Sequence, residues 1–191
     1  MAEDTSLPRP MDDPPASPVR YRVWPPALWP ADAVVVDRAH LRIARLDGLH
    51  QGLASGALAA AASVVGARPP GLGLFQASAD PRCAVRIARD RLLLVSPDPL
   101  ALEAGWQAAG FAYTPLDDGL AVFEMNGAAV PDLLRTGTAI DPDASSPCAA
   151  LQFGGFAAIV YRCQGRWRFH IERGLATAFQ TWLRQASEEL A

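Results

Sequence analysis

Hydrophobic residues near the C-terminus first alternate with polar ones and then recur at helical spacing. Between Ala149 and Leu190 the chain reads AALQFGG, FAAIVYRCQG, RWRFHIERG and then LATAFQTWLRQASEEL. Gly154-Gly155 and Gln164-Gly165 separate the three extended runs, and glycine favours tight hairpin turns because these need positive φ. Apolar residues then recur every three or four positions, at Leu175, Phe179, Trp182, Leu183, Ala186 and Leu190. The pattern predicts a three-strand meander followed by a C-terminal helix.

The last of the extended runs places residues of different character on its two faces. Trp167, Phe169 and Ile171 share one face, because successive side chains of a strand point to opposite sides. The other face carries Arg166, Arg168 and His170. We predict that the apolar face packs in the core. We also predict that His170 is a solvated strand histidine rather than a catalytic one.

Four arginines gather around the second turn of the meander, at Arg162, Arg166, Arg168 and Arg173. Such a group can clamp a carboxylate or a pyrophosphate, or form ion pairs with a partner subunit. The simpler alternative is a solvated, arginine-rich face. Both interpretations stay open from the sequence alone, and the four arginines are candidates for a partner interface.

Upstream, short apolar runs and turn signals predict strand pairs that alternate with single helices. The predicted strands cover 33–36, 41–46, 83–87, 91–96, 111–115 and 120–125. The predicted helices cover 51–65, 99–109 after an N-cap at Asp98, and 128–136, with Val130 as an alternative start for the last. Tight turns rather than long crossovers join most consecutive strands, which is typical of an α+β fold. We therefore expect antiparallel sheets with helices packed on one face.

The first 30 residues are rich in proline, with eight in all. Proline lacks an N–H and fixes φ, so this segment cannot sustain a helix or a central strand. We expect a disordered or partner-docking tail over residues 1–30 and a folded domain over 31–191. Large aromatic side chains in the tail either dock on a partner surface or pack back onto the chain's own domain. They are Tyr21, Trp24 and Trp29.

Charge and composition argue against several function classes. The net charge of −3 gives no reason to expect binding to nucleic acid. All 17 basic residues are arginine, which rules out a Schiff-base lysine and the lysine of a phosphate-binding loop. We expect no membrane span, because no apolar run is long enough. The acidic, proline-rich start also lacks the apolar stretch of a signal peptide.

Familiar catalytic and metal-binding motifs are missing from the sequence. Cys83, Cys148 and Cys163 are far apart and form no CxxC pair, so neither a disulfide framework nor a zinc site is expected, and a reducing cytoplasm fits. The histidines form no metal motif, and no serine lies in GxSxG. Gly71-Leu72-Gly73 and Asp117-Asp118 have the composition of loops and turns.

Residues 85 to 187 carry a series of short motifs. In chain order they are the strand Arg89-Asp90-Arg91-Leu92-Leu93-Leu94, the helix residues Asn126-Gly127, Ala129-Val130, Leu133-Leu134 and Gly137, the loop Ala139-Ile140-Asp141-Pro142, the strand Ile159-Val160-Tyr161-Arg162, the segment Phe169 to Ala176, and Phe179 with Trp182-Leu183. In these motifs the chain resembles the gamma subunits of heterotetrameric sarcosine oxidases and of the related N-methylamino-acid dehydrogenases.

This resemblance implies a fold and a role. The fold would be similar to a smaller version of the folate-binding domain of the aminomethyltransferase superfamily. In such bacterial oxidases, FAD, FMN, NAD and tetrahydrofolate belong to larger flavoprotein subunits. The resemblance therefore implies that this chain binds no cofactor and has no catalytic residue of its own. Its role in one-carbon metabolism would be to assemble and stabilise a cytoplasmic complex.

Two alternatives remain beside the oxidase subunit. The first is a stand-alone folate-binding protein or one-carbon transferase of the same fold, in which Arg173 and Asp141 are conceivable partners for folate. The K-G-C-Y-x-G-Q-E type motif of stand-alone folate-dependent repair proteins is absent, and a chain without lysine cannot hold it intact. The second alternative is a scaffold domain without any connection to an oxidase.

Overall fold

The computed structural model describes residues 34–190 except 118, 142 and 145, all within the compact unit Ala31–Ala191. The proline-rich tail over 1–30 lies outside the described residues, together with Tyr21, Trp24 and Trp29. The docking role of these three aromatic residues therefore stays a prediction.

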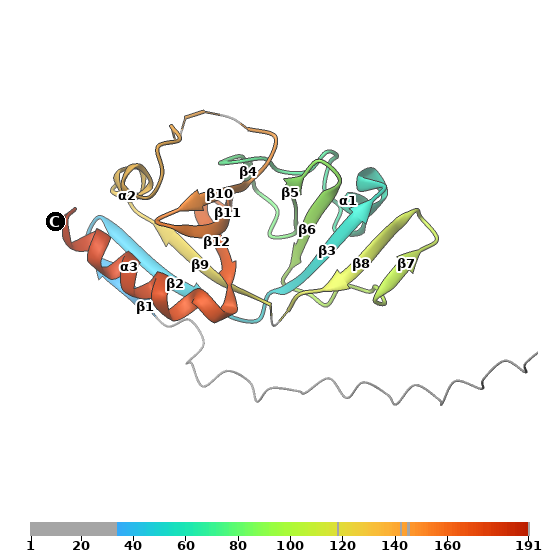
Figure 1. The fold of residues 1–191 in the computed structure, drawn as a ribbon, viewed down its shortest axis with the longest axis horizontal. Coiled ribbons are helices and arrows are strands. Elements are labelled where there is room, and N and C mark those ends of the chain that lie inside the picture. Colours follow the sequence, from blue (N-terminus) through green and yellow to red (C-terminus); the bar gives the residue numbers. More distant parts are fainter. Residues whose placement is uncertain (1–33, 118, 142, 145, 191) are drawn as a thin grey trace, which may run out of the picture. The chain divides into compact units, whose positions relative to one another are not determined.

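Strands of the described residues form two sheets, which we call the first and the second sheet (Figure 1). The first sheet has the order β1 (Val34–Arg38), β2 (Leu41–Leu46), β9 (Leu120–Asn126), β12 (Arg166–Glu172), β11 (Phe156–Cys163) and β10 (Ala150–Phe153), and β4 (Ala77–Ser78) pairs with β11 in parallel. The second has the order β5 (Cys83–Ala88), β6 (Arg91–Ser96), β3 (His50–Gly56), β8 (Phe111–Pro115) and β7 (Gly105–Gln107). All the other neighbouring strands are antiparallel.

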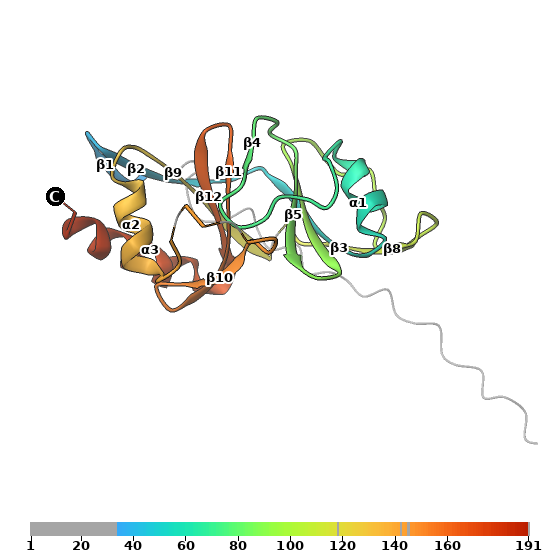
Figure 2. The ribbon, with the colours of Figure 1, turned by 90° about the horizontal axis from the view of Figure 1, so that it is seen from above.

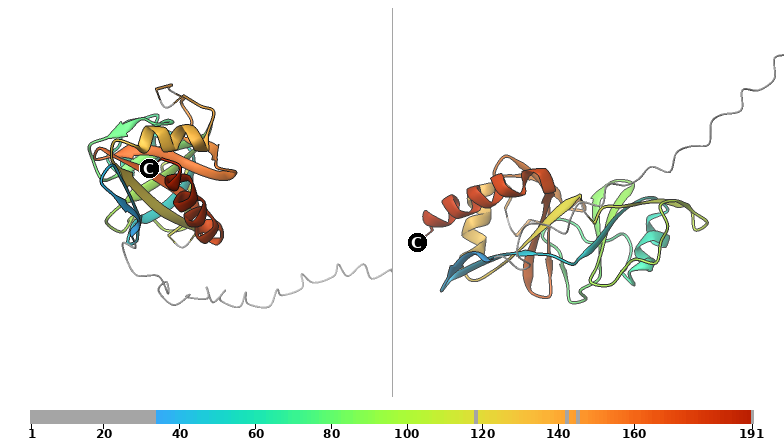
Figure 3. Two further views of the ribbon diagram at one scale, coloured as in Figure 1. Left: turned by 90° about the vertical axis from the view of Figure 1, so that its left-hand side faces the viewer. Right: turned by 90° about the horizontal axis from the view of Figure 1, so that it is seen from below.

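Helices cover the sides of the two sheets that face away from each other (Figure 2). The described helices are α1 (Leu58–Val64), α2 (Val130–Gly137) and α3 (Ala176–Glu188), the last preceded by the 3₁₀ turn η1 (Arg173–Leu175). Residues of α2 and α3 share one hydrophobic core with the first sheet, and residues of α1 share another with the second. Seen from one end, α2 and α3 both lie in front of the first sheet (Figure 3, left). The expected fold class, α+β with antiparallel sheets and helices on one face of each, is confirmed.

Aromatic rings hold α3 against the first sheet. Phe179 is fully buried, and its ring centroid lies 5.2 Å from that of Phe123 and 5.3 Å from that of Phe156. Phe153 and Trp182 complete this cluster, with ring centroids 5.1 Å apart. The three- and four-residue spacing of apolar side chains thus produces the helix and also selects the face that it buries.

Two glycines of the sequence motifs occupy positions where a side chain does not fit. A Cβ at Gly137, the last residue of α2, would lie 2.3 Å from the ring of Phe153. A Cβ at Gly127 would lie 2.3 Å from the carbonyl oxygen of His40, and the φ of Gly127 is +118°. These two motif glycines are therefore packing positions.

One predicted helix, 51–65, is wrong in its first half. Residues 50–56 form β3, which pairs with β6 on one side and with β8 on the other. Gly52 lies against the ring of Tyr113, and Gly56 has a φ of +119°. Pairing on both edges of β3 outweighs the helical propensity of an alanine- and leucine-rich run, because propensity is a weak local preference.

The predicted helix 99–109 is also wrong. Its first half is not helical, Gly105–Gln107 form the edge strand β7, and Gly105 has a φ of +115°. Leu100 and Leu102 pack against the core beneath α1 instead of lining a helix. Strands 41–46, 91–96 and 111–115 have the predicted bounds.

Candidate functional site

A layer of polar side chains lies between the two sheets, on the polar face of β12. His170 is 1% exposed, so the prediction of a solvated histidine is wrong. Of the two interpretations of the arginines, a solvated face fits Arg166, whose side chain is 54% exposed, but not Arg168, which is 6% exposed. The second sheet covers this face of the first, since Tyr161 and Cys163 share a buried cluster with Val85 of β5. A polar pattern along one strand cannot reveal that a second sheet will cover it.

His170 is held from both sides by hydrogen bonds. Its Nε2 lies 3.0 Å from the Tyr161 hydroxyl, and its Nδ1 lies 2.6 Å from Oε1 of Gln51. Because an amide oxygen can only accept, Nδ1–H donates to Gln51 and Nε2 accepts from Tyr161. The amide nitrogen of Gln51 in turn donates to the carbonyl oxygen of Leu120 at 3.1 Å. This series of hydrogen bonds links β11 and β12 of the first sheet to β3 of the second.

Burial keeps the side chains of His170 and Tyr161 in this series uncharged. It lowers the pKa of His170 to about 3, with a further contribution from the positive charge of Arg168. Burial also raises the pKa of Tyr161 well above its usual range. Neither side chain exchanges a proton near neutral pH, so their geometry fits a structural link better than acid–base catalysis.

The low pKa of His170 predicts a loss of stability in acid. Unfolded histidine takes up a proton below pH 6.5, whereas folded His170 stays neutral down to about pH 3. The unfolded state therefore binds more protons in this window, and the free energy of unfolding should fall by up to about 1.4 kcal/mol per pH unit. Urea unfolding between these pH values should show a shallower fall for His170→Gln. Equal slopes for the two proteins would contradict the prediction.

A carboxylate lies between two arginines in the same layer. Glu124 of β9 and Arg168 of β12 are directly opposite partners, with Oε2 and Nε 3.3 Å apart. The other carboxylate oxygen lies 2.6 Å from a guanidinium nitrogen of Arg166, whose side chain is 54% exposed. Arg168 and Glu124 are thus a buried ion pair, and Arg166 closes it from the solvent side.

The four predicted arginines do not form one patch. Arg162 points to the opposite face of the first sheet, where its Nε donates to the carbonyl oxygen of Phe75 and its guanidinium lies 5.3 Å from the ring centre of Trp167. Arg173 follows the far end of β12, where its backbone N–H donates to the carbonyl oxygen of Gly119. The structure brings together only Arg166 and Arg168, through Glu124.

Two aspartates that drew attention in the sequence serve local structure. Asp117 accepts a hydrogen bond of 2.6 Å from the backbone N–H of Gln51, which fixes the turn before β9. Asp141, the conceivable folate contact, is exposed and accepts a hydrogen bond from the backbone N–H of Asp143. Sequence reasoning missed Gln51 because it lay in the predicted helix. The turn Asp47-Gly48 before it and Gly56 after it are the signals of a strand.

Two cysteines that are far apart in the sequence meet between the sheets. Their Sγ atoms, in Cys83 of β5 and Cys163 of β11, lie 3.8 Å apart, and both residues are buried. A hydrogen bond from Cys83 and the positive charge of Arg168 lower the pKa of Cys163 to about 7. The same hydrogen bond and burial raise the pKa of Cys83. Cys148 lies elsewhere, with its Sγ 3.0 Å from the carbonyl oxygen of Ile87.

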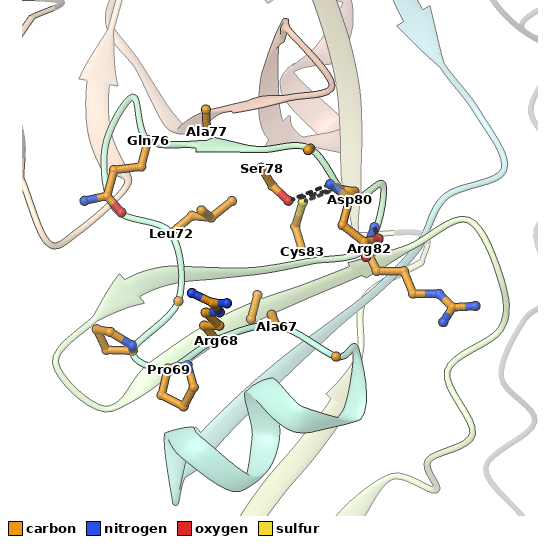
Figure 4. A pocket seen from close by; sticks show the side chains of 15 residues that line it. Ala67, Arg68, Pro69, Leu72, Gln76, Ala77, Ser78, Asp80, Arg82 and Cys83 are labelled. Carbon is orange, nitrogen blue, oxygen red and sulfur yellow. Dashed lines mark hydrogen bonds between the residues drawn. The ribbon is translucent and has the colours of Figure 1, made fainter.

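The described part of the chain has one hollow beside the cysteine pair and another beside His170. The larger, about 690 Å³, is lined by residues 66–72 and 76–84 apart from residue 81, and Cys83 forms part of its wall (Figure 4). The other, about 480 Å³, is mostly apolar, with Leu151, Ile159 and His170 among its lining residues. In the described part of the chain, no three His, Cys, Asp or Glu side chains group in a way that could hold a metal ion.

Comparisons with known proteins agree with the fold. No protein-family model and no curated protein matches the chain. Among solved structures, a chain of the heterotetrameric sarcosine oxidase from Corynebacterium sp. U-96, in complex with pyrrole 2-carboxylate, matches with a TM-score of 0.61 and 17% identity. The match covers 82% of this chain and 88% of that one. Within the described residues no helix is both long and apolar enough to span a bilayer. Over most of its length, the chain therefore has the fold of a subunit of a sarcosine oxidase complex.

Proposed function

We propose that this chain is a non-catalytic accessory subunit of a hetero-oligomeric, flavin-dependent oxidase that acts on sarcosine or a related N-methylamino acid. The observation that carries the proposal is the shared fold over 82% of this chain and 88% of a chain from such a complex. FAD, FMN, NAD and tetrahydrofolate would then be bound by larger partner subunits, in the cytoplasm.

The polar layer supports a structural role. Its buried histidine, tyrosine, glutamate and arginine are engaged with one another across three strands. A catalytic acid or base needs a pKa near the working pH and access to substrate. His170 has neither property, since its pKa is lowered to about 3 and it is 1% exposed.

The surface offers candidate contacts for a larger partner. Trp106 is 73% exposed on β7, the last strand of the second sheet. Exposed tryptophans and open strand edges are typical of surfaces that other chains cover. Arg166 is also half exposed beside the buried Glu124. We propose Trp106 and Arg166 as partner contacts, in addition to the aromatic residues of the tail.

Kinetics of the assembled complex test the non-catalytic role. The chain, its His170→Gln variant and its Trp106→Ala variant are each co-purified with the products of the neighbouring genes. Turnover is then measured with sarcosine and related N-methylamino acids. We expect His170→Gln to leave kcat within about twofold for the assembled complex, because no transition-state contact is lost. We expect Trp106→Ala to weaken assembly by about tenfold or more, as for a central interface tryptophan. A large loss of kcat in an intact His170→Gln complex would contradict the proposal.

A further inference from the structure

The structure places two cysteine thiols in contact at the junction of the two sheets. Cys83 is the first residue of β5, at the edge of the second sheet, and Cys163 is the last residue of β11 in the first. Their sulfur atoms lie 3.8 Å apart, and both lie within reach of the carbonyl oxygen of Asp80, at 3.6 and 3.4 Å. The pair is joined by side-chain packing between the sheets and not by neighbouring sequence positions.

We propose that Cys83 and Cys163 are a peroxide-sensitive thiol pair that closes into a disulfide and covalently joins the two sheets. A disulfide needs its sulfur atoms about 2.05 Å apart. From 3.8 Å, rotation of two side chains at strand ends can supply the remaining approach. This inference rests on the cysteine pair and its surroundings, and it holds whether or not the chain belongs to an oxidase.

The larger hollow borders the pair at Cys83, whereas Cys163 does not line it, so an oxidant from this side must pass Cys83 to reach Cys163. Cys83 forms part of the wall of this space of about 690 Å³, which is large compared with a peroxide molecule. Figure 4 shows the side chains of Cys83 and Ser78 directed toward one another there. We assign Cys163 as the nucleophile, because the hydrogen bond from Cys83 and the positive charge of Arg168 lower the pKa of its thiol. The reactive form of a cysteine is the thiolate, and a neighbouring cation increases its population.

The chemistry uses two thiols and one hydrogen peroxide. The Cys163 thiolate attacks one peroxide oxygen, the O–O bond breaks, and the sulfenic acid of Cys163 forms as hydroxide leaves. Hydroxide takes the proton of Cys83, and the Cys83 thiolate then attacks the sulfur of Cys163 and displaces a second hydroxide. The second hydroxide combines with the proton that Cys163 lost when its thiolate formed. The products are therefore one disulfide and two water molecules. The sulfurs lose two electrons and the peroxide gains them.

The bond would close a long loop. The two cysteines are separated by 80 positions, and cross-linking so distant residues restricts the unfolded chain strongly. We therefore expect the oxidised protein to melt about 10 °C higher than the reduced protein. Dithiothreitol should reverse the shift.

The test is peptide mapping of the full chain after mild oxidation. The reduced protein is treated with hydrogen peroxide or with buffer, the remaining thiols are alkylated in denaturant, and the protein is digested without reductant. Mass spectrometry should find a peptide that links Cys83 to Cys163 only after peroxide treatment, while Cys148 stays alkylated. The Cys148→Ser variant is the matched control and should form the same link.

Further variants separate the steps. In Cys83→Ser the resolving thiol is gone, so dimedone should trap the sulfenic acid of Cys163. Thermal melting of each reduced variant confirms that it is folded. The proposal is overturned if Cys83 and Cys163 both remain alkylated in folded, peroxide-treated protein, or if Cys163 links to Cys148 instead. A linked protein that melts at or below the temperature of the reduced one would also overturn it.

Discussion

Replacing Glu124 by alanine is expected to lower the free energy of unfolding by about 3–5 kcal/mol. Glu124 is 8% exposed, and its carboxylate is the ion-pair partner of the 6% exposed Arg168. Without the carboxylate, a guanidinium would remain buried between two sheets with its charge uncompensated. Urea unfolding monitored by circular dichroism measures the change. An unchanged m value would show that the substitution alters stability and not the amount of surface that unfolding exposes.

Arg166 provides the matched control for this substitution. It contacts the same carboxylate at 2.6 Å, but its side chain is 54% exposed. Arg166→Ala should therefore cost no more than about 1 kcal/mol, as exposed ion pairs do. The double variant Glu124→Leu with Arg168→Met should recover much of the loss, because it removes both buried charges. A Glu124→Ala protein as stable as Arg166→Ala would contradict the buried ion pair.

Replacing Phe179 by alanine is also expected to cost about 3–5 kcal/mol. The ring is fully buried and meets the rings of Phe123, Phe153, Phe156, Phe169 and Trp182. These neighbours lie on several strands and on α3 itself, so they cannot all move to fill the space. Thermal and urea unfolding measure the loss.

Trp106 is the control for the loss of a large aromatic ring. It is 73% exposed on β7, so Trp106→Ala should change the stability of the isolated chain by no more than about 0.5 kcal/mol. If Phe179→Ala were equally mild, α3 would not be anchored to the first sheet as the ring contacts indicate.

Local pattern determines the parts of the fold that depend on neighbouring residues. The Gly154-Gly155 turn, the alternation of Phe169 and Ile171, and the helical spacing through Phe179 predict the meander and α3 correctly. The same information failed for residues 50–56, where pairing on both strand edges overrides helical propensity. It also failed for 99–109, where a predicted N-cap and proline are not followed by a helix.

The polar layer depends on contacts that sequence spacing does not encode. Gln51 and His170 are 119 positions apart, and Cys83 and Cys163 are 80 apart. A strand with alternating polar residues looks solvated until a second sheet is known to cover it. For the same reason, three distant cysteines gave no sign that two of them meet.

The polar layer between the sheets and the exposed edge of the second sheet connect the stability of the chain with the function proposed for it. A buried hydrogen bond between His170 and Gln51 joins the two sheets, and the ion pair of Glu124 with Arg168 joins two neighbouring strands of the first sheet. Within the second sheet the layer contacts β3 through Gln51, and the edge strand β7 of the same sheet carries the exposed Trp106. Under the accessory role that we propose, this exposed edge would contact another subunit.

The most direct measurement is the mass of the assembly that the chain forms. The chain is co-expressed with the products of its neighbouring genes, purified through a tag on this chain, and measured by size-exclusion chromatography with light scattering. We predict a single complex of fixed stoichiometry that contains the flavoproteins and has more mass than any of its chains. If the chain elutes alone while all the neighbouring subunits are present and folded, its role as an accessory subunit is contradicted.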